Sequence, residues 1–121
     1  MAAPNIVNVA TITGKTAGYA VTTSLASTGV TNPAGSNKVF KINTINCSNI
    51  GNTNTTISVT VYKGGTTQYY IAYGVTVPLG STLIVVNKND NNFYLEEGDT
   101  IYAQAGANST LQLLISYEEI S

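Results

Sequence analysis

Apolar and polar residues alternate with a period of two along most of the chain. Segments rich in Val, Ile, Thr and Tyr occupy 5–13, 17–25, 39–49, 55–63, 67–77, 82–87, 100–105 and 110–118, with a short extended piece at 93–95. Clusters of Gly, Asn and Pro separate them, and no stretch has the 3.6-residue apolar period of a capped helix. Short strands at regular spacing are typical of two packed antiparallel sheets. We therefore predict an all-β fold, a single antiparallel β-sandwich, jelly-roll-like, of about eight strands.

The turn between 55–63 and 67–77 selects a register. A three-residue loop, Gly64-Gly65-Thr66, would pair Val61 with Tyr69, Val59 with Ile71 and Ile57 with Tyr73. A two-residue loop would turn the apolar set of the second strand outward, so burial favours the odd length.

The same reasoning predicts a second hairpin across 106–110, which would pair Ala105 with Leu111, Ala103 with Leu113 and Ile101 with Ile115. These two registers leave a neutral set of side chains outside, namely Tyr62, Tyr70, Tyr102 and Leu114 with Gln68, Gln104 and Gln112. Low charge and many aromatics are typical of the centre of an interface, whereas packing of some Tyr rings under loops would give the same pattern.

Charge is scarce and ordered along the chain. Only 9% of the 121 residues are charged, far below the roughly 25% of an ordinary domain, so weak repulsion between copies favours self-association. All five Lys precede all six acidic residues: residues 1–89 carry +5 and residues 90–121 carry −6.

Two interpretations of this order stay open. Glu96, Glu97 and Asp99 could form an acidic end that attracts Lys38, Lys41 or Lys63 at another place on a neighbouring copy, closing a ring such as a trimer. Alternatively, distant strands interleave and the separation in sequence disappears on folding.

The chain has few of the residues that catalytic sites use. The chain has no Arg, His or Trp. Glu96-Glu97-Gly98-Asp99 has the form of a turn in which Gly98 allows a positive φ and Asp99 caps. Cys47 lies in a strand-like segment and is expected in the core. We predict no enzymatic activity, no cofactor or metal, no nucleic-acid partner and no membrane segment.

The N-terminal region has its own open question. Residues 1–37 contain one charge, turn chemistry at Gly14-Lys15 and a predicted loop over 27–37. They could form an arm exchanged with a neighbouring subunit, or two strands that pair within a domain spanning 1–121.

Four segments resemble a known class of protein. Asn5–Thr16, Lys38–Ile50 and the stretches Tyr94–Ile101 and Ser116–Ser121 are similar to small virion structural proteins of tailed phages, particularly those infecting marine cyanobacteria. The resemblance implies a particle component made in the host cytoplasm, with the major capsid protein, other virion proteins or further copies of itself as partners. We expect a capsid decoration or cement protein. A tail, baseplate or fibre component, or a receptor- or glycan-binding module, is the alternative.

Overall fold

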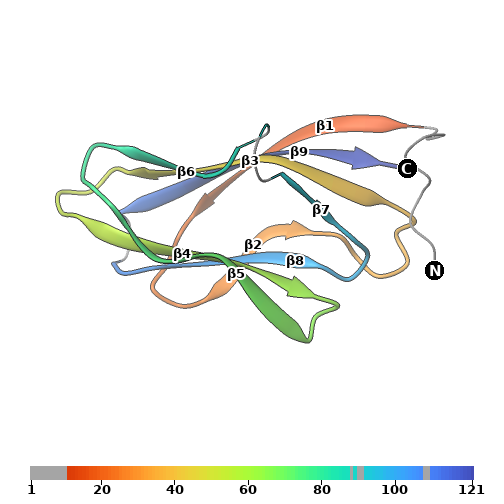
Figure 1. Ribbon diagram of the computed structural model, residues 1–121, viewed down its shortest axis with the longest axis horizontal. Helices are drawn as coiled ribbons and strands as arrows, with labels where there is room; N and C mark the ends of the chain where they lie inside the picture. Colours follow the sequence, from red (N-terminus) through yellow and green to blue (C-terminus); the bar gives the residue numbers. More distant parts are fainter. Residues whose placement is uncertain (1–10, 88, 90–91, 108–109) are drawn as a thin grey trace.

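The computed structural model describes residues 11–87, 89, 92–107 and 110–121, and these residues contain β-strands and no helix. Two antiparallel sheets of five and four strands pack face to face (Figure 1). The strands are β1 (Ile12–Ala20), β2 (Ala26–Thr31), β3 (Val39–Asn49), β4 (Thr55–Lys63), β5 (Thr67–Val77), β6 (Thr82–Val86), β7 (Phe93–Leu95), β8 (Thr100–Ala105) and β9 (Leu111–Ile120). The predicted all-β sandwich is confirmed.

Each sheet combines strands from distant parts of the chain. Sheet A has the order β1-β9-β3-β6, and β7 also pairs with β3. Sheet B has the order β2-β8-β4-β5. Figure 1 shows sheet A as the upper layer and sheet B as the lower one. The chain crosses between the layers at most of its connections, so the core is built from contacts between residues far apart in sequence.

The core follows from the two-residue period of the central strands. Ile45 and Cys47 of β3, Ile57 and Val59 of β4, and Ile101 of β8 have no exposed surface. Alternate side chains of a strand point to one face, so these positions fill the space between the layers. Each fully buried Ile or Val contributes roughly 1.5–3 kcal/mol relative to an exposed one.

The predicted β4–β5 turn is correct, but the register beyond it is not. Lys63 pairs with Thr67 around Gly64-Gly65-Thr66, and Val61 pairs with Tyr69 as expected. Register shifts between Ile57 and Val59 and between Val59 and Thr60 then displace the partners. Val59 lies opposite Ala72 instead of Ile71, and Ile57 lies opposite Val75 instead of Tyr73. Bulges of this kind add residues to one strand and change which face a side chain occupies.

The expected inward face of β5 is therefore largely wrong. Tyr69 and Tyr73 are 62% and 75% exposed, Val75 is 37% exposed, and only Val77 is fully buried. β5 is one of the two edge strands of sheet B.

The predicted hairpin across 106–110 is wrong, because β8 and β9 belong to different sheets. Ala103 pairs with Val59 of β4, whereas Leu113 pairs with Cys47 of β3. The predicted inward residues are nevertheless buried. They face one another across the core instead of lying side by side, and both arrangements produce the same apolar alternation.

The N-terminal strands also differ from their predicted bounds. β1 runs straight through Gly14-Lys15, where a turn was expected, and β2 lies largely in the predicted loop over 27–37. β1 pairs with β9 and β2 pairs with β8 of the same chain. Of the strand predicted over 5–13, residues 5–10 lie outside the described residues.

A buried asparagine organises each end of the sandwich. Asn32 donates from Nδ2 to the carbonyls of Lys38 and Leu95, at 2.8 and 2.9 Å. Asn49, at the opposite end, donates from Nδ2 to the carbonyls of Thr53 and Val77, both at 2.9 Å. Such amides satisfy loop carbonyls that secondary structure leaves unpaired, and so hold the loops in place.

Candidate interaction surfaces

A buried carboxylate joins two turns at one end of the molecule. Asp99 is 2% exposed, and its oxygens accept hydrogen bonds from the backbone N–H groups of Gly64 and Glu96, both at 2.9 Å. The Lys63 ammonium donates to Asp99 at 2.6 Å and to Glu96 at 2.9 Å. Gly98 has the expected positive φ, 88°. All of these contacts lie within the chain, so Asp99 has a structural role here.

This pairing shifts the pKa of Lys63. Partial burial would by itself lower that pKa, but the hydrogen bonds to Asp99 and Glu96 raise it above its usual 10.5.

Two further acidic residues also have partners within the chain. Glu97 accepts a hydrogen bond of 2.9 Å from the backbone N–H of Asn37, a residue with a positive φ of 59°. Glu119 binds Lys15 at 3.0 Å and Lys38 at 3.1 Å. Burial would raise the pKa of Glu119, but the hydrogen bonds from the two Lys lower it below 4.5.

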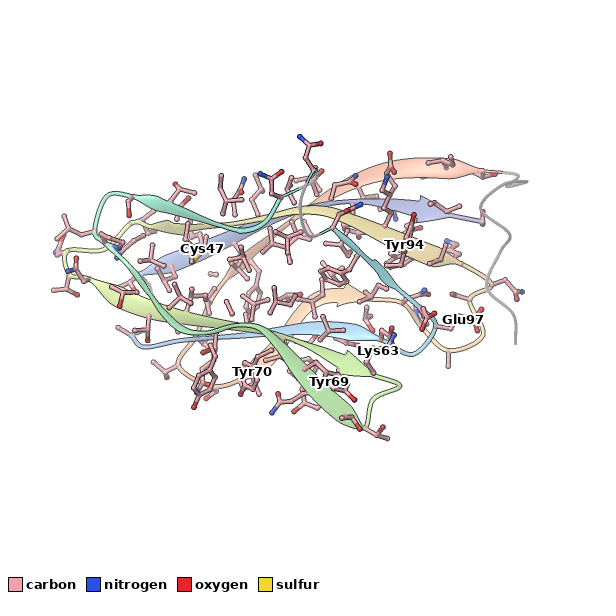
Figure 2. The ribbon with its side chains drawn as sticks, in the orientation of Figure 1. Cys47, Lys63, Tyr69, Tyr70, Tyr94 and Glu97 are labelled. Carbon is pink, nitrogen blue, oxygen red and sulfur yellow. The ribbon has the colours of Figure 1, made fainter. Side chains whose placement is uncertain are left out.

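The interpretation that an acidic end attracts lysines of a neighbouring copy requires the two kinds of charge to lie apart on each molecule. The structure shows that this requirement is wrong. Lys63 lies in the same cluster as Glu96 and Asp99, and Lys38 binds Glu119. Figure 2 places Lys63 and Glu97 at the same end of the sandwich. Folding brings the basic and acidic parts of the chain together, so their separation in sequence does not persist in space.

Charge is instead polarised along the long axis. The described charged residues are Lys15, Lys38, Lys41, Lys63, Glu96, Glu97, Asp99, Glu118 and Glu119. They lie around the turns 64–66 and 96–99, the loop 32–38 and the adjoining strand segments, which we call the charged end. The opposite end consists of the loops 21–25, 50–54, 78–81 and 106–107 with Thr110, and none of these described residues is charged. We call it the neutral end.

Backbone hydrogen bonds tie the loops of the neutral end to one another. Asn49 donates to Ser81 at 3.0 Å and accepts from Gly80 at 3.2 Å, and Ile50 donates to Thr110 at 2.7 Å. Gly51 approaches Thr110 so closely that an added Cβ would lie 2.6 Å from its methyl carbon. The neutral end is thus closely packed.

Two large apolar side chains are exposed on this neutral end. Ile50 is 59% exposed and Leu79 is 55% exposed. Their loops are neighbours, because Asn49 is hydrogen-bonded to both Gly80 and Ser81. The alternation of apolar and polar residues did not predict this pair; the signal in the sequence was the lack of charge in the loops between strands at this end.

The outer face of sheet B carries three of the predicted tyrosines. Tyr70 and Tyr102 lie opposite Thr60, and the rings of Tyr62 and Tyr102 pack with centroids 4.4 Å apart. Tyr70 meets Tyr73 edge-on at 4.8 Å. Figure 2 shows Tyr70 on the lower side of the lower sheet. Thr60 has no exposed surface, and its hydroxyl has no partner within the described part of the chain.

Leu114 lies on the other outer face, that of sheet A, and so does not join the tyrosines. It is 52% exposed and lies opposite Gly18 of β1 and Asn46 of β3. Gly18 leaves open space beside it, in a shallow depression of about 440 Å³ that Ala20, Ser48 and Gln112 also line. The predicted neutral surface is thus two surfaces on opposite sides of the sandwich.

The described residues offer little for metal or thiol chemistry. Among them, no group of three or more Cys, Asp and Glu side chains is arranged to hold a metal ion. Cys47 is fully buried as predicted, and burial raises the pKa of its thiol to about 11. In the part of the chain that the structure describes, no helix is long and apolar enough to cross a membrane.

No protein-family model matches this sequence, and no curated protein matches it either. Membership of a phage structural family stays a prediction from the sequence.

Proposed function

We propose that this protein is a non-enzymatic structural component of a tailed-phage particle, a decoration or cement protein that docks on the capsid through its neutral end. The observation that carries the proposal is the closely packed, uncharged surface bearing exposed Ile50 and Leu79. Interface centres are depleted in charge, and a surface that is already ordered loses little conformational entropy on binding.

The strand order supports the same assignment. Orders of β1-β9-β3-β6 and β2-β8-β4-β5 place the first and last strands side by side, and the second beside the eighth. We interpret this pairing of early with late strands as a jelly roll, an architecture that recurs in viral capsid proteins and lectins. The resemblance of the sequence to phage virion proteins points in the same direction.

Copy number in purified particles tests the location. We expect this protein in hundreds of copies per particle, as for a component that covers a symmetric shell. A few tens of copies or fewer would assign it to the tail, baseplate or fibre, and absence from the particle would reject the structural assignment.

The docking surface is tested by paired charge substitutions. Ile50→Lys with Leu79→Lys should abolish rebinding of the purified protein to heads that lack it. Tyr94→Lys is the control, because Tyr94 is 42% exposed but lies on β7 opposite Lys41, at the charged end. We expect it to bind normally. Equal loss in both variants would refute docking by the neutral end.

Salt dependence gives an independent test. The ion pairs among the described residues join groups of the same chain, so few of these charges are left to steer a partner. Association should change by less than about threefold between low and physiological salt, unlike steered association, which falls steeply.

Glycan binding is the second candidate, favoured by the tyrosines of sheet B. Tyr69 and Tyr73 are the most exposed aromatic side chains described, and both lie on β5. A glycan array should give hits that disappear with Tyr73→Ala if this face binds sugars. An array without hits would reject this candidate and leave the structural one intact.

A further inference from the structure

β1 forms one edge of sheet A along its whole length. It pairs with β9 at nine consecutive positions, from Ile12 opposite Ile120 to Ala20 opposite Gln112, without a register shift. Within the described ranges, no strand pairs with its other edge. A regular, unpaired edge of this length is a template for adding another strand.

The hydrogen bonds at both ends of β1 show which backbone groups face away from the sheet. Thr11 and Ser121 exchange two bonds, of 3.0 and 2.9 Å, and Val21 donates to Leu111 at 3.0 Å. Odd-numbered residues therefore bond to β9, because bonding alternates along an antiparallel pair. The N–H and C=O groups of the even-numbered residues point outward from the free edge, and these residues are Ile12, Gly14, Thr16, Gly18 and Ala20.

The other sheet edges are interrupted in ways that β1 is not. β5 has two register shifts against β4, and Gly74 within it has a φ of 60°. β2 has a register shift against β8 and a φ of 88° at Gly29. β6 and β7 are only five and three residues long. Bulges and short lengths protect an edge from further pairing.

β1 has none of these protections. It contains no proline, and its only charged residue, Lys15, is held by Glu119 at 3.0 Å. Gly14 and Gly18 have no atom within 4 Å of an added Cβ, so the surface beside the edge is open. An incoming strand would meet no unpaired charge of β1, and it would meet no side chain at Gly14 or Gly18.

We propose that this edge binds β1 of a second copy of the chain, antiparallel, about a two-fold axis at Thr16. The centre of β1 suits this pairing: Gly14 would face Gly18 of the second copy, so no side chains would oppose each other there, and Thr16 would face its own equivalent. Thr–Thr pairs stabilise neighbouring strands. Lys15 would face Ala17, so the two lysines would not oppose each other.

The pairing would join the two copies of sheet A into one continuous sheet through about ten backbone hydrogen bonds. A two-fold contact uses the same surface on both copies and closes at the dimer, so it does not propagate into fibres. The proposal concerns sheet A alone and does not depend on whether the protein belongs to a phage particle.

Sedimentation of the wild-type protein and two variants over a range of concentrations tests the proposal. The N–H of Thr16 points away from β9, so Thr16→Pro removes an outward donor without breaking a bond within the chain. We expect a wild-type dimer and at least tenfold weaker association of Thr16→Pro, on the order expected for two lost hydrogen bonds. Thr16→Val keeps the N–H and should still dimerise. A wild-type monomer at all concentrations, or a dimer that survives Thr16→Pro, would overturn the proposal.

Cross-linking tests the register and does not require the proline variant to fold. Two Thr16→Cys sites would lie about 5.5 Å apart between Cα atoms, within the range of a disulfide. Two Gly14→Cys sites would be about 13 Å apart, because each faces position 18 instead. Oxidation should link Thr16→Cys and leave Gly14→Cys unlinked, and the buried Cys47 should not interfere. Equal cross-linking at the two positions, or none at position 16, would refute the two-fold at Thr16.

Discussion

The Oδ1 atom of Asp99 accepts a hydrogen bond of 2.9 Å from the backbone N–H of Gly64. This bond connects the turn after β4 to the turn before β8, which are 35 residues apart in sequence. Both β4 and β8 belong to sheet B and pair directly. The carboxylate therefore holds two neighbouring strands together at the point where their own ladder ends.

Removing this carboxylate should destabilise the fold. Asp99→Ala leaves the N–H groups of Gly64 and Glu96 without their acceptor, and we expect a loss of about 2–4 kcal/mol in the free energy of unfolding. Urea denaturation measures it. Glu96→Ala is the matched control, because Glu96 also binds Lys63 but its side chain is 66% exposed. It should cost less than about 1 kcal/mol, and equal losses would contradict the role given to Asp99.

Acid should weaken the protein through Glu119. The pKa of this carboxyl is lower in the folded state than its usual 4.5, so its pairing with Lys15 and Lys38 stabilises the fold fully above that pH. The stabilisation is lost as the pH falls through the folded pKa, because both states then carry the proton. Glu119→Gln should be less stable than wild type at pH 7, and the difference should shrink toward zero at the lowest pH at which both variants still fold. A difference independent of pH would exclude this linkage.

Two buried threonines should respond in opposite directions to the same substitution. Thr60 is fully buried and its hydroxyl has no partner among the described residues, whereas the hydroxyl of Thr28 donates to the carbonyl of Ile101 at 2.9 Å. Thr60→Val should be neutral or stabilising by up to about 1–2 kcal/mol, since it removes an unpaired polar group. Thr28→Val should cost about 1–2 kcal/mol. Thermal unfolding of both variants measures the two changes in stability. A large loss of stability in Thr60→Val would show that the Thr60 hydroxyl makes a hydrogen bond.

Cys47 should report unfolding directly. Its thiol is fully buried and its pKa is raised to about 11, so little thiolate exists at neutral pH and no reagent can reach it. A thiol reagent should modify the native protein only at the rate at which it opens, and Asp99→Ala should accelerate the reaction. An added surface cysteine in the β4–β5 turn, Thr66→Cys, should react at once, because Thr66 is exposed. Rapid modification of Cys47 in the wild type would contradict the buried position.

Several features that depend only on residues close together in sequence, including two turns and a buried strand position, were predicted correctly. The Gly64-Gly65-Thr66 loop was predictable because two glycines that tolerate a positive φ lie between alternating strands, and both have one, 62° and 74°. The burial of Cys47 followed from its place in an apolar strand. The turn at Glu96–Asp99 followed from Gly98.

Long-range arrangement was not predictable from the same patterns. Ala103 and Leu113 point into the core whether their strands pair side by side or face each other from two sheets, so alternation could not show that β8 and β9 separate. The bulges after Ile57 have no sequence marker. The partners of the charged residues depend on which strands meet, and the separation of Leu114 from the tyrosines depends on the division into sheets.

The order of strands in sheet A also constrains how the protein forms during synthesis. β9 lies between β1 and β3 and pairs with both, so these two strands can be joined into one sheet only after the last strand has been made. Contacts of such long sequence separation slow folding. During translation, both edges of β1 therefore stay unpaired until most of the chain has been made. We expect nascent chains on neighbouring ribosomes to meet through this strand, and a chaperone that shields extended segments to raise the yield of folded protein.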